Sequence, residues 1–262
     1  MKNKILDLWK EKKPCINAWL SIPNSFTAEA FSKMQWDSVT IDMQHGQNDY
    51  SSSISMIQAI SINNPNPLVR VLWNEPGIIM KMLDLGATGI IAPMINSKKE
   101  CEDFVSYCYY PPIGQRSFGP MRAQMFFGEN YFEKANDNII SLAMIETKQA
   151  VENLEEILSV PNLTGIYIGP ADMSTSYGLK PKFDIKEDPV FANIKMISEK
   201  TKEYNKIAGI HTGSVNYAKE MIDLGFKFIS VSSDFRIMST YANNIIEEIK
   251  DKNKSKSSNS AY

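Results

Sequence analysis

Eight short apolar segments, each followed by a stretch with helical character, constrain the fold more than any other feature of this sequence. Most are nearly continuous runs of apolar and β-branched residues, a pattern typical of strands buried on both faces of a parallel sheet. They span residues 15–21, 38–43, 67–71, 88–94, 139–146, 164–170, 206–212 and 227–233.

The stretches between these segments carry helix signals. SFTAEAFSKM (25–34) begins with residues that cap helices, and PGIIMKMLDLG (76–86) begins with proline and ends at glycine. Eight alternations of strand and helix predict an α/β fold, a single closed (β/α)8 barrel over residues 1–250. A doubly wound open sheet is the alternative. The polar, low-complexity end of the chain, 251–262, is predicted to be a disordered tail.

Composition narrows the class of protein. Of the 262 residues 43% are hydrophobic and 22% charged, and the net charge of −2 provides no basic field for nucleic acid or an anionic membrane. No apolar run approaches the roughly 18 to 20 residues of a membrane helix. The three cysteines form no Cys-x-x-Cys pair, and the amino terminus lacks an apolar signal core. We therefore expect a cytoplasmic protein with reduced thiols.

Polar and ionisable residues stand where several of the apolar segments end. In a (β/α)8 barrel the active site forms at the carboxyl ends of the strands, so these residues are the candidates for chemistry. They are Asp42, His45, Arg70, Glu146, Gly169, Asp172 and His211.

Glu146 and Asp172 follow neighbouring segments at corresponding points. Two carboxylates so placed can converge on a hard divalent cation such as Mg²⁺ or Mn²⁺, which keeps open positions for water and substrate. The alternative is structural, with Glu146 paired to a lysine and Asp172 capping the next helix. The turn from Gly169 to Ala171 adds backbone N–H groups that can hold a substrate carboxylate.

Three further residues have open interpretations. Arg70 lies inside a short apolar strand and needs an anionic partner, either a substrate or an acid on a neighbouring strand. His45 follows Asp42 by three residues. We predict that Asp42 accepts a hydrogen bond from the His45 imidazole, which fixes the tautomer of a general base. His211 either lines the pocket or caps a turn.

These groups predict one type of reaction. A divalent metal would chelate a 2-oxo acid, Arg70 would stabilise the enolate, and a histidine base would transfer a proton. The result is reversible carbon–carbon cleavage. No lysine stands at the carboxyl end of a predicted strand, which argues against a Schiff base.

The motifs also resemble a known family. TIDMQHG, PLVRVLWNEP, MLDLGATGIIAPMINS, YPPIGQRSFG, AMIET and IYIGPADMS, in collinear order from Trp19 to Asp234, resemble the HpcH/HpaI aldolases, which are metal-dependent pyruvate aldolases. The resemblance implies a barrel of the phosphoenolpyruvate/pyruvate type that forms a homo-oligomer, often a trimer of dimers with the last helix exchanged. It implies cleavage of a 4-hydroxy-2-oxo acid into pyruvate, or a close 2-oxo acid, and an aldehyde. The implied cofactor is Mg²⁺ or Mn²⁺, with Co²⁺ as a further option.

The resemblance also assigns roles by position. It makes Glu146 and Asp172 the metal ligands and His45, oriented by Asp42, a base that acts through a bound water. Arg70 would contact the keto oxygen of the substrate.

Other matched positions concern the substrate and the assembly. Amides near Ala171 would hold the pyruvyl carboxylate in the turn that begins at Gly169. Asp84, in MLDLG, matches a position that in the family reaches a neighbouring subunit's site. Arg116, in GQRSFG, matches a turn that borders the pocket.

Three residues depart from the family pattern. Gln44 stands where glutamate is common, Met144 where many members place a glutamine that contacts the pyruvyl group, and His211 where an aliphatic residue is usual. They leave the aldehyde half of the substrate open. Two other functions also remain open: a lyase of CoA thioesters like the citrate lyase β-subunit, and a non-catalytic barrel that binds a 2-oxo acid.

Overall fold

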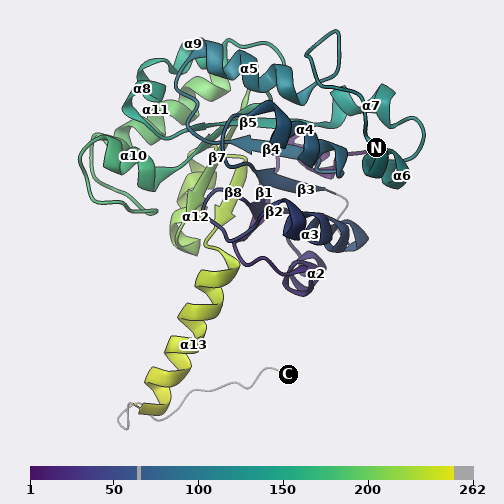
Figure 1. Ribbon diagram of the computed structural model, residues 1–262. Helices are drawn as coiled ribbons and strands as arrows, with labels where there is room; N and C mark the ends of the chain where they lie inside the picture. Colours follow the sequence, from purple (N-terminus) through teal and green to yellow (C-terminus); the bar gives the residue numbers. More distant parts are fainter. Residues whose placement is uncertain (64–65, 251–262) are drawn as a thin grey trace.

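A closed barrel of eight parallel strands forms the centre of the molecule. The computed structural model describes residues 1–63 and 66–250, in which each strand pairs with the next and β8 closes onto β1 (Figure 1). Each predicted segment contains a strand, so the barrel is confirmed and the open sheet is wrong. The strands are β1 Cys15–Leu20, β2 Ser38–Asp42, β3 Pro67–Arg70, β4 Gly89–Ala92, β5 Ile140–Ile145, β6 Gly165–Ile168, β7 Ile207–Thr212 and β8 Phe228–Val231.

Helices surround the barrel, and polar side chains fix where several of them begin. The Asn24 side chain accepts a hydrogen bond from the Thr27 amide, and that of Glu75 from the Gly77 and Ile78 amides. The helices are α1 Lys4–Lys10, α2 Ser25–Lys33, α3 Tyr50–Asn63, α4 Pro76–Asp84, α5 Lys98–Cys108, α6 Met121–Phe127, α7 Tyr131–Asn138, α8 Lys148–Glu152, α9 Leu154–Leu158, α10 Pro170–Ser176, α11 Val190–Glu203, α12 Val215–Asp223 and α13 Asp234–Lys250.

The apolar core is divided into two parts by the barrel wall. The larger part lies between the strands and the surrounding helices, and the smaller part fills the barrel interior. At the amino end, Ile5 of α1 packs into the interior cluster, and the Trp9 ring meets the edge of Phe228 with centroids 6.2 Å apart. Since α1 covers this end, the interior is accessible from the carboxyl ends of the strands.

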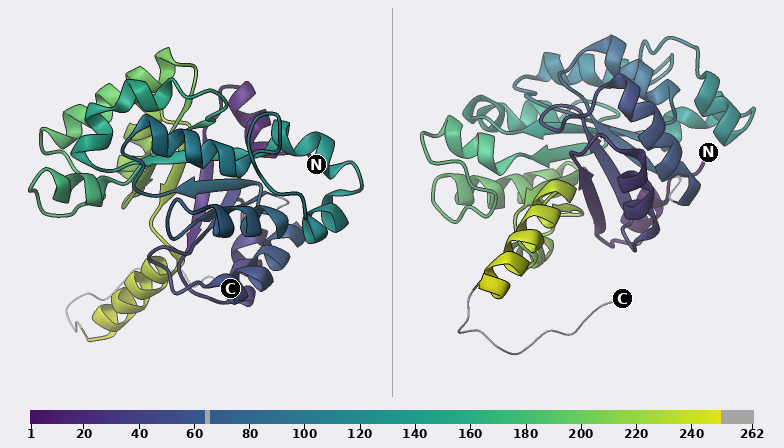
Figure 2. Two further views of the ribbon diagram at one scale, coloured as in Figure 1. Left: turned by 45° about the horizontal axis from the view of Figure 1, so that its top comes forward. Right: turned by 60° about the horizontal axis from the view of Figure 1, so that its bottom comes forward.

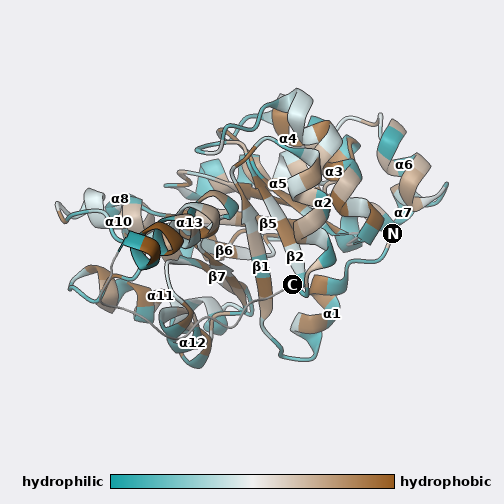
Figure 3. Ribbon diagram, turned by 90° about the horizontal axis from the view of Figure 1, so that it is seen from below, coloured by the Kyte–Doolittle hydropathy of each residue, from teal (hydrophilic) through white to brown (hydrophobic). Residues whose placement is uncertain are grey.

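The last helix, α13, projects away from the barrel (Figures 1 and 2). Asp234 is its one buried residue, and the rest of the helix is exposed or half-buried. Apolar residues recur along it at a spacing of four, at Ile237, Tyr241, Ile245 and Ile249. Seen along its axis, the helix carries hydrophobic and hydrophilic residues side by side (Figure 3). This apolar stripe has no cover within the described part of the chain.

Two further expectations concern membrane-spanning helices and the carboxyl-terminal tail. No helix within residues 1–63 and 66–250 has the length and apolar character that crossing a membrane requires. The tail predicted at 251–262 lies outside the described residues.

Candidate active site

A cavity of about 470 Å³ lies at the carboxyl ends of the strands. It brings together most of the residues predicted from sequence: Asp42, His45, Arg70, Met144, Gly169, Ala171, Asp172 and His211. Glu146 is buried and follows β5, next to the cavity-lining turn at Gly169. Asp84 and Arg116 are not among the cavity residues.

Asp42 and Arg70 form a bidentate ion pair in the cavity wall. The two residues are register partners on β2 and β3, with Arg70 Nε 2.8 Å from Asp42 Oδ1 and Nη2 2.6 Å from Oδ2. The Trp19 indole donates to Oδ2 at 3.2 Å. Burial disfavours ionisation of Asp42, but the Arg70 charge and these hydrogen bonds outweigh it and hold the pKa of the carboxyl below its ordinary value. Arg70 thus pairs with an acid on the neighbouring strand, one of its two predicted partners.

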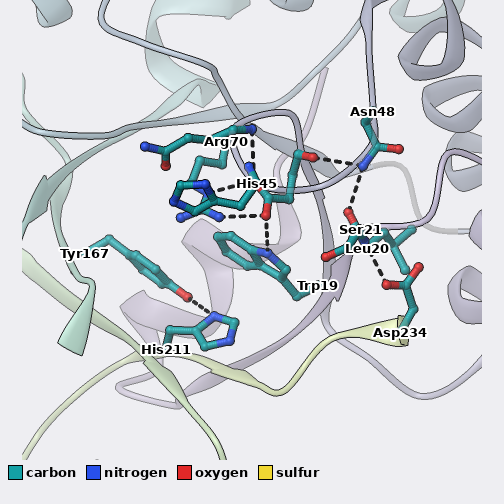
Figure 4. Close-up of polar contacts among 11 residues, drawn as sticks. Trp19, Leu20, Ser21, His45, Asn48, Arg70, Tyr167, His211 and Asp234 are labelled. Atoms are coloured by element: carbon teal, nitrogen blue, oxygen red, sulfur yellow. Dashed lines mark hydrogen bonds and ion pairs between the residues drawn. The ribbon is translucent and has the colours of Figure 1, made fainter. Parts of the chain in front are cut away.

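The predicted hydrogen bond between Asp42 and the His45 imidazole is wrong. Oδ1 of Asp42 accepts from the backbone amides of Gln44 at 3.0 Å and His45 at 3.3 Å (Figure 4). The strand register places Arg70 opposite Asp42, and the turn after β2 folds its amides onto the same carboxylate. The exposed His45 side chain lines the cavity without help from Asp42.

A buried asparagine shapes this turn, and the sequence analysis did not identify it. The Asn48 side chain donates to the carbonyl oxygens of Leu20 at 3.0 Å and Asp42 at 2.9 Å, and so ties together the ends of β1 and β2 (Figure 4). A Cβ at Gly46 would lie 2.2 Å from the Asp42 carbonyl oxygen. The short Gln-His-Gly-Gln-Asn stretch therefore sets the place of His45 at the cavity rim.

Glu146 is a buried carboxyl group without a cationic partner. Its Oε1 accepts from the Met94 amide at 2.7 Å, and no lysine or arginine pairs with it among the described residues. Burial raises the pKa of Glu146 to about 7; the negative charge of Asp172 adds to this, while the Met94 bond and the Arg70 charge oppose it. The predicted alternative of a lysine partner is thus wrong within this part of the chain.

Asp172 lies in the first turn of α10, close enough to Glu146 to affect its ionisation. It forms no side-chain capping bond, so the predicted capping role is also wrong. Gly169 separates the two acids, and a Cβ at this position would lie 2.5 Å from Glu146 Oε2. Glycine is therefore required for the carboxylate to occupy its place.

The donor set at this point fits one kind of metal. Residues 1–63 and 66–250 contain no group of three or more histidine, cysteine, aspartate or glutamate side chains that could hold an ion. A structural zinc site with its full set of protein ligands is therefore ruled out for that part of the chain. Two carboxylates with room for water and substrate suit an Mg²⁺-like cation, which retains waters and needs few protein ligands.

Aromatic residues form another wall of the cavity, and sequence reasoning identified only its histidine. Trp19 stacks on Tyr167 with ring centroids 5.6 Å apart, and His211 meets Trp19 edge-on at 5.0 Å. Tyr167 Oη lies 3.2 Å from His211 Nδ1 (Figure 4). Phe183, from the long connection after α10, also contacts His211. His211 therefore lines the pocket, one of its two predicted roles.

Arg116 lies elsewhere, in contrast to the expectation that it borders the pocket. Its Nη2 is 2.7 Å from Asp84 Oδ1, its Nη1 donates to Tyr131 Oη at 3.1 Å, and its guanidinium stacks on Tyr110. Asp84 is the last residue of α4. This helix begins near the carboxyl end of β3 and ends near the amino end of β4. The pair is thus on the opposite side of its own barrel from the cavity.

The barrel and the charged cavity at its carboxyl end define a (β/α)8-barrel enzyme. A model of the HpcH/HpaI aldolase/citrate lyase family matches residues 16–240, and the chain belongs to this family.

Individual relatives agree with this assignment. The chain is 38% identical over 246 residues to the hydroxypyruvate/pyruvate aldolase of Rhizorhabdus wittichii, covering 94% of this chain and 98% of that protein. It is 33% identical over 241 residues to the 4-hydroxy-2-oxo-heptane-1,7-dioate aldolase of Salmonella arizonae, covering 91% of each. The chain is thus a carbon–carbon lyase, an aldolase of class II.

Solved structures share the fold. An HpcH/HpaI aldolase/citrate lyase family protein from Burkholderia cenocepacia superimposes with a TM-score of 0.88 at 26% identity, covering 95% of this chain and 100% of that one. The more distant citrate lyase β-subunit of Mycobacterium tuberculosis, complexed with oxaloacetate and magnesium, has a TM-score of 0.55 at 13% identity, covering 84% and 91%.

Proposed function

We propose that this enzyme reversibly cleaves a 4-hydroxy-2-oxo acid into pyruvate, or a close 2-oxo acid, and an aldehyde, with a divalent cation held by Glu146 and Asp172. The observation that carries the proposal is the buried Glu146 carboxyl group, which has no cationic partner and stands beside a second acid. Mg²⁺ or Mn²⁺ is the proposed metal, because both accept few protein ligands and retain water. When bound, the cation supplies a Lewis acid for the keto group.

Arg70 would bind the keto oxygen of the substrate. Its Nε and Nη2 donate to Asp42, which leaves Nη1 without a partner among the described residues and the guanidinium against the cavity. The ion pair and the Trp19 ring, 4.8 Å from Cζ, fix the orientation of this donor before substrate arrives. A fixed donor directed at developing negative charge stabilises the transition state without the cost of reorganisation during the reaction.

His45 would act as the base, directly or through a water. It takes the proton of the C4 hydroxyl, the C3–C4 bond breaks, and C4 becomes the aldehyde carbon. The electron pair of the broken bond forms the enolate of pyruvate, which Arg70 stabilises, and a proton then adds at C3. The backbone amides of Ala171 and Asp172 are the proposed contacts of the substrate carboxylate.

A second copy of the chain would complete the assembly, with Asp84 reaching the neighbouring site. The uncovered apolar stripe of α13 supports an oligomer in which this helix packs on another subunit, as in a trimer of dimers. The three cysteines are free and buried, which supports the cytoplasmic location expected from sequence.

Exchange of the pyruvate C3 protons tests the proposal without knowledge of the aldehyde. The purified protein is incubated with pyruvate in deuterated buffer with Mg²⁺, with Mn²⁺, or with a chelator. We expect exchange that depends on the metal, and its loss in Glu146→Gln and Asp172→Asn. No exchange with any metal would instead identify a barrel that binds without catalysis.

A further inference from the structure

The loop that follows β4 contains a residue in a conformation that its type rarely adopts. Met94 lies two residues beyond Ala92, where β4 ends, and has a φ of 55°. This is the left-handed region, which an L side chain enters only when neighbouring contacts hold it there. The backbone amide of Met94 donates to Glu146 Oε1 at 2.7 Å. A strained backbone thus carries the one amide that holds the buried carboxyl group.

The Asn96 side chain contacts the chain on both sides of this hydrogen bond. Its Nδ2 donates to the Met94 carbonyl oxygen at 2.9 Å, and its Oδ1 accepts from the Thr147 hydroxyl. Thr147 directly follows Glu146 and caps α8, where its Oγ1 accepts from the Ala150 amide at 3.0 Å. One side chain therefore fixes the backbone beside the donor and the backbone beside the acceptor.

The backbone of Asn96 is itself fixed by the surrounding helices. Its amide donates at 2.7 Å to Oε2 of Glu100, in the first turn of α5. Its carbonyl oxygen accepts from Asn153 Nδ2, between α8 and α9, at 2.8 Å. Asn96 is not among the residues that line the cavity. It therefore acts on a ligand in the cavity through the residues that it holds.

The two oxygens of Glu146 have different surroundings as a result. Oε1 accepts from the Met94 amide, whereas Oε2 faces Gly169, where a Cβ would lie 2.5 Å away. Gly169 lines the cavity and immediately precedes α10, the helix that carries Asp172. Oε2 is thus the oxygen of Glu146 on the side of the second acid.

We propose that Asn96 is a positioning residue for the cation site. By holding Met94 in its left-handed conformation, Asn96 keeps the Met94 amide on Oε1 and leaves Oε2 of Glu146 directed to the cation. A small cation such as Mg²⁺ demands near-ideal ligand geometry, so a carboxylate that is fixed before the ion arrives binds it more tightly. This inference rests on the proposed cation site and names a residue that prepares it.

The affinity for Mn²⁺ in the absence of pyruvate tests the proposal. Isothermal titration calorimetry measures the Kd for wild type and for two variants of Asn96. In Asn96→Ala we expect Kd to rise about tenfold, a typical loss when a residue that orients a metal ligand is removed. Asn96→Asp keeps the acceptor for Thr147 but loses the donor to Met94. It should also weaken binding, although the added negative charge by itself would attract the cation.

Substitutions of Met94 distinguish positioning from a general loss of structure. Glycine enters the left-handed region without a steric penalty, so it needs no side chain to hold it there. In the Met94→Gly background, Asn96→Ala should therefore raise Kd by about twofold or less. Alanine removes the same side chain as glycine but keeps the steric penalty. In the Met94→Ala background, the effect of about tenfold should persist.

Asn3→Ala is the matched control for the loss of asparagine hydrogen bonds. Asn3 caps α1 at the opposite end of the barrel, where its Nδ2 donates to the carbonyl oxygens of Thr88 at 3.2 Å and Asn138 at 2.9 Å. Its Oδ1 accepts from the Ile5 amide at 3.1 Å. The variant should lower the melting temperature of the protein and leave the Kd for Mn²⁺ unchanged.

The outcomes separate this inference from the reaction on which it rests. If either variant of Asn96 binds Mn²⁺ as tightly as wild type, the positioning role is wrong and the metal-dependent aldolase stands. The same holds if Asn96→Ala has equal effects in the Met94→Gly and Met94→Ala backgrounds, or if Asn3→Ala weakens binding as much. If Glu146→Gln binds Mn²⁺ as tightly as wild type, or pyruvate does not exchange its protons with any metal, both proposals fall.

Discussion

Arg70 and Asp42 face each other across adjacent strands, joined by contacts of 2.8 and 2.6 Å, with both side chains nearly buried at the mouth of the barrel. The pair holds a guanidinium in a fixed plane while one of its nitrogens remains available to a ligand. In the proposed reaction the Asp42 carboxylate would act on the substrate through Arg70, so a change in either residue should affect the reaction through the same geometry.

Arg70→Lys should lower kcat/KM for aldol cleavage by about 10²-fold or more, because an ammonium group cannot donate twice to Asp42 and also reach the substrate. Coupled pyruvate release measures this effect, and circular dichroism establishes that the variant is folded. A rate within threefold of wild type would show that the guanidinium fork has only a structural role.

The Glu146 carboxyl group should make stability depend on pH in the metal-free protein. Its pKa is raised to about 7 in the folded state from an ordinary value of 4.5, so the folded state binds the proton more tightly than the unfolded state. The stability that this provides is complete below pH 4.5 and is lost as the pH rises through 7. This contribution of Glu146 to the free energy of unfolding is at most about 3 kcal/mol.

Chemical denaturation from pH 5 to pH 8 measures this contribution. The free energy of unfolding of wild type should fall more with pH than that of Glu146→Gln, which cannot ionise. Mg²⁺ should restore stability at pH 8 and have little effect at pH 5, where a proton competes for the same carboxylate. Identical pH profiles for the two proteins would contradict the assigned ionisation.

The fold could be predicted from sequence because its signal is local and repeated. A parallel strand buried on both faces is a continuous apolar run, and each of the eight runs contains its strand. The alignment of strand ends then placed residues such as Glu146 and Asp172 near one another without any knowledge of contacts.

The partners of individual side chains were less predictable. The pairing of Asp42 with Arg70 follows from the register between two strands, whereas sequence proximity favoured His45. Tyr167 resembled an ordinary core residue, because an aromatic residue inside an apolar strand has the same sequence pattern whether its side chain packs in the core or lines a cavity. Arg236, which also lines the cavity, follows the last strand on an exposed helix, where charged residues are common and carry little information.

The apolar stripe of α13 should hold subunits together. Placing charges in it with the double variant Ile245→Asp/Ile249→Asp should shift the protein to a smaller species, because a buried unpaired carboxylate is strongly unfavourable. Sedimentation velocity measures the change. Ile62→Asp is a suitable control, since Ile62 is 74% exposed on α3, away from α13. An unchanged sedimentation coefficient in the double variant would show that α13 is not at an interface.

Gly169→Ala should weaken metal binding more than it weakens the fold. The added Cβ would lie 2.5 Å from Glu146 Oε2, so the carboxylate must move away from the place where it stands beside Asp172. We expect the Mg²⁺ concentration at half-maximal pyruvate exchange to rise at least tenfold, because a misplaced ligand loses much of its coordination energy. Gly119→Ala is the matched control, with no atom closer than 3.9 Å to the added Cβ. If both variants required the same Mg²⁺ concentration as wild type, Glu146 would not be a ligand of the cation.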